Sequence, residues 1–160
     1  MIKRSVTGKT ICYIGIIIII LDQLTKYLVR HFLTKDLTIS GFGFQFVKNT
    51  GAGFGILQNQ PMLLVWISLI ILGLLLYYNQ SFMKTKLLAI SYALLIGGLI
   101  GNLLDRIIFQ YVTDFIKLGP WPNFNIADMA LTAAIIGFII YSFKESSTSP
   151  SANQKLKRAK

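Results

Sequence analysis

Four long apolar stretches divide the chain, at about residues 11–32, 61–78, 87–104 and 126–143. The hydrocarbon core of a bilayer is ~30 Å thick and takes ~20 helical residues to cross. The second and third stretches contain no charged residue, which is typical of segments surrounded by lipid. The pattern therefore predicts an all-α integral membrane protein with four transmembrane helices.

The connection between the first two stretches has a different pattern. Within residues 37–47, part of the segment alternates aromatic side chains with small or polar ones, and glycine stands at positions 41 and 43. Such alternation around glycine is typical of short strands on a membrane surface. We therefore expect a small β-element that rests on the ends of the helices.

Composition supports the membrane interpretation. Of the 160 residues, 54% are hydrophobic and 14% are charged, and the mean hydropathy is +0.61. A soluble domain carries about 25% charged residues, so a soluble globular fold fits this chain poorly. In a soluble protein the net charge of +10 would suggest a nucleic-acid partner. Here the basic residues follow membrane topology, and no nucleic-acid partner is expected.

The positions of lysine and arginine predict the orientation of the helices, because basic residues in short loops favour the cytoplasmic side. Most of them lie before the first stretch, between the second and third, or after the fourth. They are Lys3, Arg4, Lys9, Lys84, Lys86, Lys144, Lys155, Lys157, Arg158 and Lys160. Both termini are therefore expected in the cytoplasm and the β-element outside it. Residues 1–143 are expected to form a single membrane domain, and residues 144–160 a basic, disordered cytoplasmic tail.

Candidate chemistry is limited by composition. The chain has one cysteine, Cys12, and one histidine, His31. This excludes a zinc cluster and a Cys/His nucleophile pair, and no metal is expected. Catalysis, if present, must come from carboxylates, hydroxyls or lysines.

Several ionisable residues fall within the apolar stretches or at their edges, where a charge costs about 2.5–3.5 kcal/mol at the membrane centre. They are Asp22, Lys26, Arg30, Asp105, Arg106, Asp114 and Asp128. The expected topology places all of them in the outer half of the membrane or at its outer surface. Each therefore needs a structural or functional reason.

Helical spacing groups some of these residues. Asp22, Lys26 and Arg30 share one face. For Asp22 and Lys26, a structural ion pair and the support of an active site remain equally open, whereas Arg30 is expected to extend its charge to the membrane surface. Asn102 and Arg106 also share a face, and they can donate hydrogen bonds either to a bound peptide or to loop carbonyls.

Asp114 and Asp128 are candidates for a catalytic pair. They are fourteen positions apart, a spacing that allows the two carboxylates to meet without requiring it. Asp128 can instead stabilise the start of a helix through the macrodipole, and Asp114 can be a turn or capping residue. Spacing alone favours these structural roles.

Five short segments occur in order along the chain: residues 22–26 (DQLTK), 48–55 (KNTGAGFG), 97–106 (GGLIGNLLDR), 112–115 (VTDF) and 124–128 (FNIAD). Each alone is a weak signal. Together, on a four-helix chain of this length, they resemble the lipoprotein signal peptidases (signal peptidase II) over about residues 10–143.

The resemblance implies a four-helix bundle with an outer β-cradle and assigns roles to particular residues. It implies that Asp114 and Asp128 are the catalytic aspartates. The further site residues are Asn49, Gly51, Asn102, Arg106 and Asn125, and we expect Asp22 and Lys26 to support them.

The resemblance also implies an activity. The chain is expected to be a membrane aspartyl endopeptidase that cuts diacylglyceryl-modified prolipoproteins before the lipidated cysteine. It is expected to need no cofactor and to act as a monomer in contact with membrane lipid, at the outer surface of a bacterial plasma membrane. Two departures concern the substrate groove: Gly53 stands where the family usually has alanine, and the loop between the aspartates is short.

Two alternatives come from other functional classes. Intramembrane aspartate and lysine also mark ion paths, as in a small ion-coupled transporter. A structural membrane subunit could use the same polar residues to pack against a partner.

Overall fold

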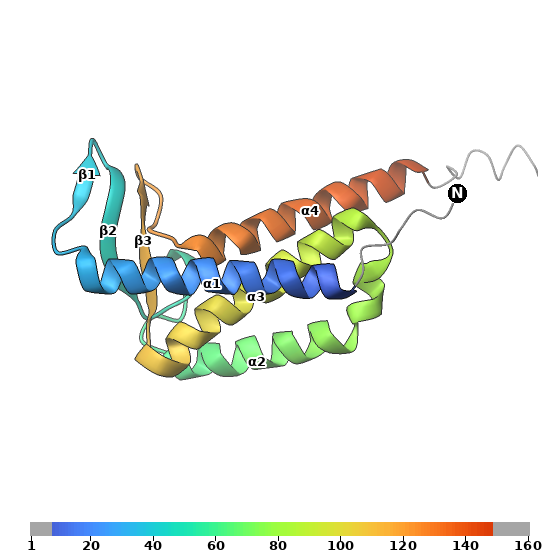
Figure 1. Cartoon of the computed structure of the whole chain (residues 1–160), viewed down its shortest axis with the longest axis horizontal. Coiled ribbons are helices and arrows are strands. Elements are labelled where there is room, and N and C mark those ends of the chain that lie inside the picture. Colours follow the sequence, from blue (N-terminus) through green and yellow to red (C-terminus); the bar gives the residue numbers. More distant parts are fainter. Residues whose placement is uncertain (1–7, 149–160) are drawn as a thin grey trace, which may run out of the picture.

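The computed structural model describes residues 8–148, which form four helices beside a small sheet (Figure 1). The helices are α1 (Gly8–Phe32), α2 (Pro61–Tyr77), α3 (Lys86–Phe109) and α4 (Ile126–Thr148). Each coincides with one of the apolar stretches. Helices α1, α3 and α4 are long and apolar enough to cross a membrane, and α2 is a shorter apolar helix of 17 residues. The expected membrane character of the fold is confirmed at this level.

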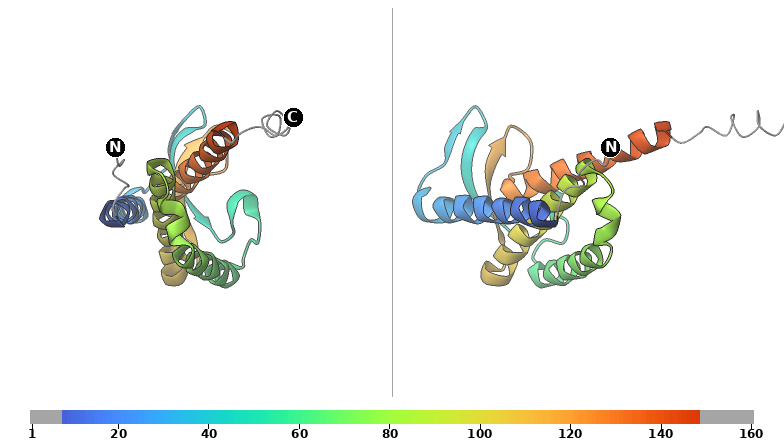
Figure 2. Two further views of the ribbon diagram at one scale, coloured as in Figure 1. Left: turned by 90° about the vertical axis from the view of Figure 1, so that its right-hand side faces the viewer. Right: turned by 45° about the vertical axis from the view of Figure 1, so that its right-hand side comes forward.

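Helix α3 is the centre of the bundle. Viewed end-on, it lies between α1 on one side and α2 and α4 on the other (Figure 2). Its glycines permit the close approach that small residues give to membrane helices. A Cβ added at Gly98 would lie 2.6 Å from the Ala127 carbonyl oxygen of α4, and one at Gly101 would lie 2.6 Å from Oδ2 of Asp22 on α1.

The two ends of the bundle differ in what they bury. At the end where α2 and α3 are joined by the 3-10 helix η2 (Asn79–Met83), the buried cluster is apolar and contains Ile11, Ala89, Tyr92 and Ala93. The Tyr92 hydroxyl donates to the Leu75 carbonyl oxygen at 3.1 Å and so ties α3 to α2. The opposite end carries the sheet and buries polar residues.

The sheet confirms the expected β-element and extends it. Strands β1 (Leu37–Ile39) and β2 (Phe42–Asn49) form an antiparallel hairpin. Its turn residues Ser40 and Gly41 have φ values of 50° and 83°, as a two-residue hairpin turn requires. A third strand, β3 (Val112–Leu118), pairs antiparallel with β2 in the order β1-β2-β3. The alternative that Asp114 is a turn or capping residue was wrong, because Asp114 sits on β3 opposite Val47.

Helix α4 runs on to Thr148, beyond the expected boundary at residue 143. Residues 144–148 of the expected tail are therefore helical. Residues 149–160 of that tail, and the basic residues Lys3 and Arg4, lie outside the described residues.

Candidate active site

The sheet end of the bundle gathers polar side chains from α1, α3 and β3 and from the residue directly before α4. Those buried there are Asp22, Lys26, Asn102, Asp105, Arg106, Thr113, Asp114 and Asn125. Burying such groups is unfavourable unless they are hydrogen-bonded or paired. The hydrogen-bond and ion-pair partners of these groups therefore show how the cluster is organised.

Asp114 and Asp128 meet through Asn125. The Asn125 side-chain amide donates to Asp114 Oδ1 at 2.7 Å, and the Asn125 backbone N–H donates to Asp128 Oδ2 at 3.2 Å. In return, the Asp128 N–H donates to the Asn125 side-chain oxygen at 2.9 Å. This reciprocal pair is a capping box at the start of α4. Asp128 therefore has the helix-terminal role expected from spacing, and its carboxylate also faces the cavity that Asp114 lines.

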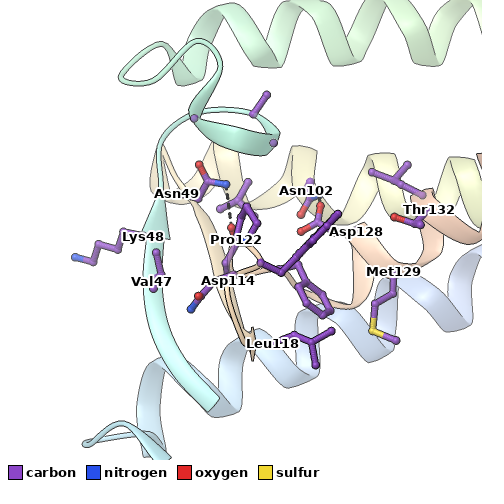
Figure 3. A pocket seen from close by; sticks show the side chains of 18 of the residues that line it. Val47, Lys48, Asn49, Asn102, Asp114, Leu118, Pro122, Asp128, Met129 and Thr132 are labelled. Atoms are coloured by element: carbon purple, nitrogen blue, oxygen red, sulfur yellow. Dashed lines mark hydrogen bonds between the residues drawn. The ribbon is translucent and has the colours of Figure 1, made fainter. Parts of the chain in front are cut away.

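Asp114 is buried at the edge of that cavity, where Figure 3 shows Asn49, Asn102, Asp114 and Asp128 near one another. Burial, followed by the negative charge of Asp128, raises the pKa of Asp114 from 3.8 to about 7. Hydrogen bonds from Asn49 and Asn125 act in the opposite direction but do not offset these two effects. Near neutral pH, the two aspartates are thus suited to sharing one proton.

Asn49 and Gly51 form one side of the site. Asn49 donates to Asp114 Oδ2 at 2.9 Å, and its side-chain oxygen accepts the Gly51 N–H at 2.9 Å. The Gly51 carbonyl accepts from Arg106 Nη2 at 2.9 Å. A Cβ at Gly51 would lie 2.8 Å from the Ile56 carbonyl oxygen, so the loop fits closely only with glycine. Of the two roles open to Arg106, the structure shows the contact with a loop carbonyl, and Arg106 Nε has no partner among the described residues.

Asn102 and Lys26 connect the aspartates to α1. Asn102 donates to Asp128 Oδ1 at 2.8 Å, and its side-chain oxygen accepts from Lys26 Nζ at 2.9 Å. Lys26 also pairs with Asp22 at 2.8 Å, both side chains being fully buried. Asp22 in turn accepts the Ala127 N–H at 2.9 Å. The structure therefore contains the ion pair of Asp22 and Lys26, and this pair is hydrogen-bonded to residues beside the aspartates.

Arg30 does not extend to the membrane surface, and that expectation was wrong. Its Nη1 lies 3.3 Å from Asp105 Oδ1 and 2.9 Å from Thr113 Oγ1, and its side chain is only 12% exposed. Its guanidinium lies 4.3 Å from the centre of the Phe109 ring. The buried carboxylate of Asp105 gives the guanidinium a partner that spacing along α1 alone does not reveal.

Sequence reasoning did not assign Asp105, Gln23 or Thr113 to the site. Gln23 donates to the Gly101 carbonyl at 3.0 Å and lies within 3.4 Å of both Asp22 and Asp105. The sequence held a signal for two of these residues. Asp105 follows Asn102 by three residues on one helix, and Thr113 directly precedes Asp114.

The charges of the cluster nearly balance. Among the described residues, four carboxylates, those of Asp22, Asp105, Asp114 and Asp128, lie near three cations. The cations are Lys26, Arg30 and Arg106. One proton on the Asp114–Asp128 pair makes the cluster neutral, and a neutral cluster is the less costly state in a poorly hydrated environment.

The cavity has a volume of about 950 Å³. The aspartates and asparagines form its polar side, and apolar side chains form much of the rest, including Leu118, Trp121, Phe124, Met129 and Ile136. Gly53 also lines it, and a Cβ there would meet nothing within 4 Å. Either glycine or alanine therefore fits at this position in the wall of the cavity.

Comparison with known proteins gives a consistent result. Residues 14–144 match the family described as signal peptidase (SPase) II. A lipoprotein signal peptidase of Shouchella clausii is 41% identical over 136 residues, covering 79% of this chain and 88% of the relative. One from Moorella thermoacetica is 37% identical over 128 residues, covering 77% and 85%.

A solved bacterial membrane enzyme, crystallised by the in meso method, superposes with a TM-score of 0.84 at 30% identity, covering 94% of this chain and 98% of its own. The transporter and structural-subunit alternatives find no support in these comparisons. The chain belongs to the signal peptidase II family of aspartic peptidases.

Proposed function

We propose that the chain is a membrane aspartyl endopeptidase that removes the signal peptide from diacylglyceryl-modified prolipoproteins, with Asp114 and Asp128 as its catalytic residues. The observation that carries the proposal is the pair of aspartates joined by Asn125 beside an apolar cavity. Burial raises the pKa of Asp114 to about 7. A carboxyl group with this pKa can both donate and accept a proton near neutral pH, as general acid–base catalysis requires.

The reaction divides acid and base work between the two aspartates. The ionised carboxylate takes a proton from water as the water oxygen attacks the scissile carbonyl. The protonated carboxyl gives its proton to the carbonyl oxygen, forming a neutral tetrahedral intermediate. When the C–N bond breaks, the proton taken from water passes to the leaving amine of the lipidated cysteine. One hydroxyl of the intermediate returns its proton to the other carboxylate, so a carboxylic acid is released and the pair regains its single shared proton. The pair titrates as a unit, so neither aspartate is assigned the first proton.

Acid–base catalysis contributes typically ~10²–10⁴-fold, and peptide hydrolysis needs more. Side-chain donors around the pair supply positioning and charge stabilisation. Asn49 and Asn102 orient the carboxylates, and the guanidinium of Arg106, whose buried Nε has no partner among the described residues, adds a positive charge to the wall of the cavity. Gly51 and Asn125 fix the backbone around them, and Asp22 and Lys26 support the assembly.

The proposed topology has four transmembrane helices in one peptidase domain of residues 1–143, with both termini and the basic tail of residues 144–160 in the cytoplasm. Lys9, Lys84 and Lys86 lie at the end of the bundle opposite the sheet (Figure 1), in agreement with the preference of basic loops for the cytoplasm. Helix α2, with 17 residues, is about 25 Å long, at the short end of what spans a bilayer.

This orientation puts the aspartates at the outer surface of a bacterial plasma membrane. A prolipoprotein whose cysteine carries two acyl chains is held at that surface by its lipid. The apolar walls of the cavity, formed partly by Met129 and Ile136 of α4, suit the lipid and the apolar signal peptide. The enzyme is proposed to act as a monomer in contact with membrane lipid.

The test uses the purified protein in detergent with a diacylglyceryl-modified prolipoprotein. Wild type is expected to cut before the lipidated cysteine, and Asp114→Asn and Asp128→Asn are expected to abolish cleavage while thermal unfolding shows that they remain folded. If wild type leaves a competent substrate intact, the proposed function is wrong. If one folded variant cuts at nearly the wild-type rate, that aspartate is not catalytic.

A further inference from the structure

Asp105 is a buried carboxylate for which the proposed reaction has no use. It lies on α3 and is fully buried. Its Oδ2 accepts the Thr113 backbone N–H at 2.8 Å, and Arg30 and Lys26 lie 3.3 and 3.5 Å from its oxygens. It lies outside the cavity lining, behind Thr113. Any role in the reaction must therefore act through the residues that it holds.

Thr113 transmits the position of Asp105 to the site, because it directly precedes Asp114. Strand β3 is the last strand of the sheet, so one of its edges has no neighbouring strand. At that edge the Thr113 N–H is bonded to Asp105, its hydroxyl accepts from Arg30 at 2.9 Å, and its carbonyl accepts from Asn125 at 3.4 Å. Asp105 and Asn125 thus bond the backbone groups of Thr113 that no strand pairs, and Arg30 holds its side chain. Together these contacts fix the backbone next to Asp114.

The arrangement around Asp128 is equivalent. Asp22 accepts the N–H of Ala127, the residue directly before Asp128, at 2.9 Å. Each catalytic aspartate is therefore preceded by a backbone N–H bonded to a buried carboxylate on a neighbouring helix. Lys26 lies between these two carboxylates, 2.8 Å from Asp22 and 3.5 Å from Asp105. It also donates to Asn102, which holds Asp128 directly.

We propose that Asp105 is a positioning residue for the peptidase reaction: with Arg30 it fixes Asp114 through Thr113, as Asp22 fixes Asp128 through Ala127, and Lys26 joins the two supports so that the separation of the catalytic carboxylates is constant. This inference rests on the proposed function. The charged groups around Asp105 are Lys26 and Arg30 of α1, Asp22 beyond Lys26, and Arg106 of α3. Asp114 directly follows Thr113, whose backbone N–H is bonded to Asp105.

Asp105→Asn tests the proposal, because it keeps the shape of the side chain but removes the charge that holds Arg30 and Lys26. A displacement of about 1 Å in a reacting group can cost ~10²-fold in rate. We expect kcat to fall by roughly ten- to a hundred-fold with KM changed by less than about three-fold, since binding surfaces are untouched. Asp114 would be less firmly buried, so the limb of the pH–rate profile that reports its titration would move to lower pH.

Asp36→Asn is the matched control. Asp36 is an exposed aspartate in the loop between α1 and β1 whose carboxylate accepts only from Gln45, at 3.0 Å, among the hydrogen bonds described. This variant should retain the wild-type kcat, KM and pH profile. If Asp105 were important only for stability, Asp105→Asn would lower the unfolding temperature but leave kcat per folded molecule and the pH profile unchanged, and the proposal would be overturned.

A second variant keeps the test decisive if Asp105→Asn does not fold. Thr113→Val removes the hydroxyl that accepts from Arg30 and keeps the backbone N–H that Asp105 accepts. A fall in kcat of roughly three- to ten-fold at unchanged KM would support the proposal, and a wild-type kcat would overturn it. These outcomes apply to an enzyme that cuts the prolipoprotein. A wild type that does not cut contradicts the proposed function instead.

Discussion

The two ends of the helical bundle are held together by different physical interactions. At the η2 end, Ile11, Ala89 and Ala93 pack around Tyr92, whose hydroxyl makes a single hydrogen bond to α2. At the sheet end, α1, α3 and α4 are joined by buried carboxylates, a lysine and asparagine side chains. Apolar packing tolerates substitutions that keep volume, whereas removing one partner from a buried ionic network leaves an uncompensated charge. The sheet end should therefore be the more sensitive to mutation in both activity and stability.

The largest expected effect is on activity at the sheet end. Asp128→Asn keeps an acceptor for the Asn125 N–H, so the start of α4 should stay intact. It removes one member of the proposed acid–base pair, and cleavage should fall by at least ~10³-fold. Initial rates on a lipidated prolipoprotein measure this. The control at the other end of the bundle is Glu145→Gln, on the exposed end of α4, and a comparable loss there would contradict the division between the ends.

The next effect is on stability. Lys26→Met removes the cation shared by Asp22 and Asp105, both fully buried. Breaking a buried pair in this way costs about 3–5 kcal/mol, which for a protein of this size lowers Tm by roughly 10 °C. Thermal unfolding in detergent gives the value. Lys9→Met, at an exposed position of α1, should change Tm by no more than about 1 °C. Equal losses of Tm in both variants would contradict the claim that the buried ion pairs of Lys26 stabilise the protein.

The third effect is the pH dependence of stability. The folded-state pKa of Asp114, about 7, lies above its ordinary value of 3.8. Between these values, the folded protein holds a proton that the unfolded chain has lost, so stability falls as pH rises from about 4 to about 7 and is level above that. Asp114→Asn has no carboxyl group at this position, so its stability should not fall for this reason as pH rises. The Tm of the variant minus that of wild type should therefore grow through this window, and a constant difference would show that burial of Asp114 does not destabilise the protein.

The smallest effect belongs to the apolar end. Tyr92→Phe removes the 3.1 Å hydrogen bond to the Leu75 carbonyl and keeps the ring that stacks on Phe82. The expected cost is about 1 kcal/mol, or 2–4 °C in Tm, with no change in kcat. A change in the rate of cleavage would mean that the two ends are coupled through α3.

Sequence reasoning predicted the four apolar helices because length and hydropathy decide that property locally. It predicted a small β-element around residues 37–47 from alternation and glycine, and the structure shows a hairpin there. It gave the Asp22–Lys26 ion pair as one of two alternatives from a spacing of four, and the pair is present. It missed β3, whose pairing partner β2 precedes it by more than sixty residues.

Sequence reasoning also mispredicted the surroundings of Arg30. Its partner Asp105 lies on another helix, and their contact depends on how closely α1 and α3 approach. The pairing of Asp114 with Asp128 came from a family resemblance, since their spacing alone favoured separate structural roles.

The outer edge of β3, which has no neighbouring strand, bears on how a peptide can be recognised, because its N–H groups already have partners. Asp105 occupies the Thr113 N–H, and the Phe124 carbonyl accepts the N–H groups of Phe115 and Ile116. No backbone ladder is therefore left along this edge for an incoming peptide to extend the sheet by β-augmentation. At this edge, a substrate can be held by individual side-chain donors and by apolar surface. Such contacts depend little on the residues of the peptide, which permits one enzyme to accept many signal sequences.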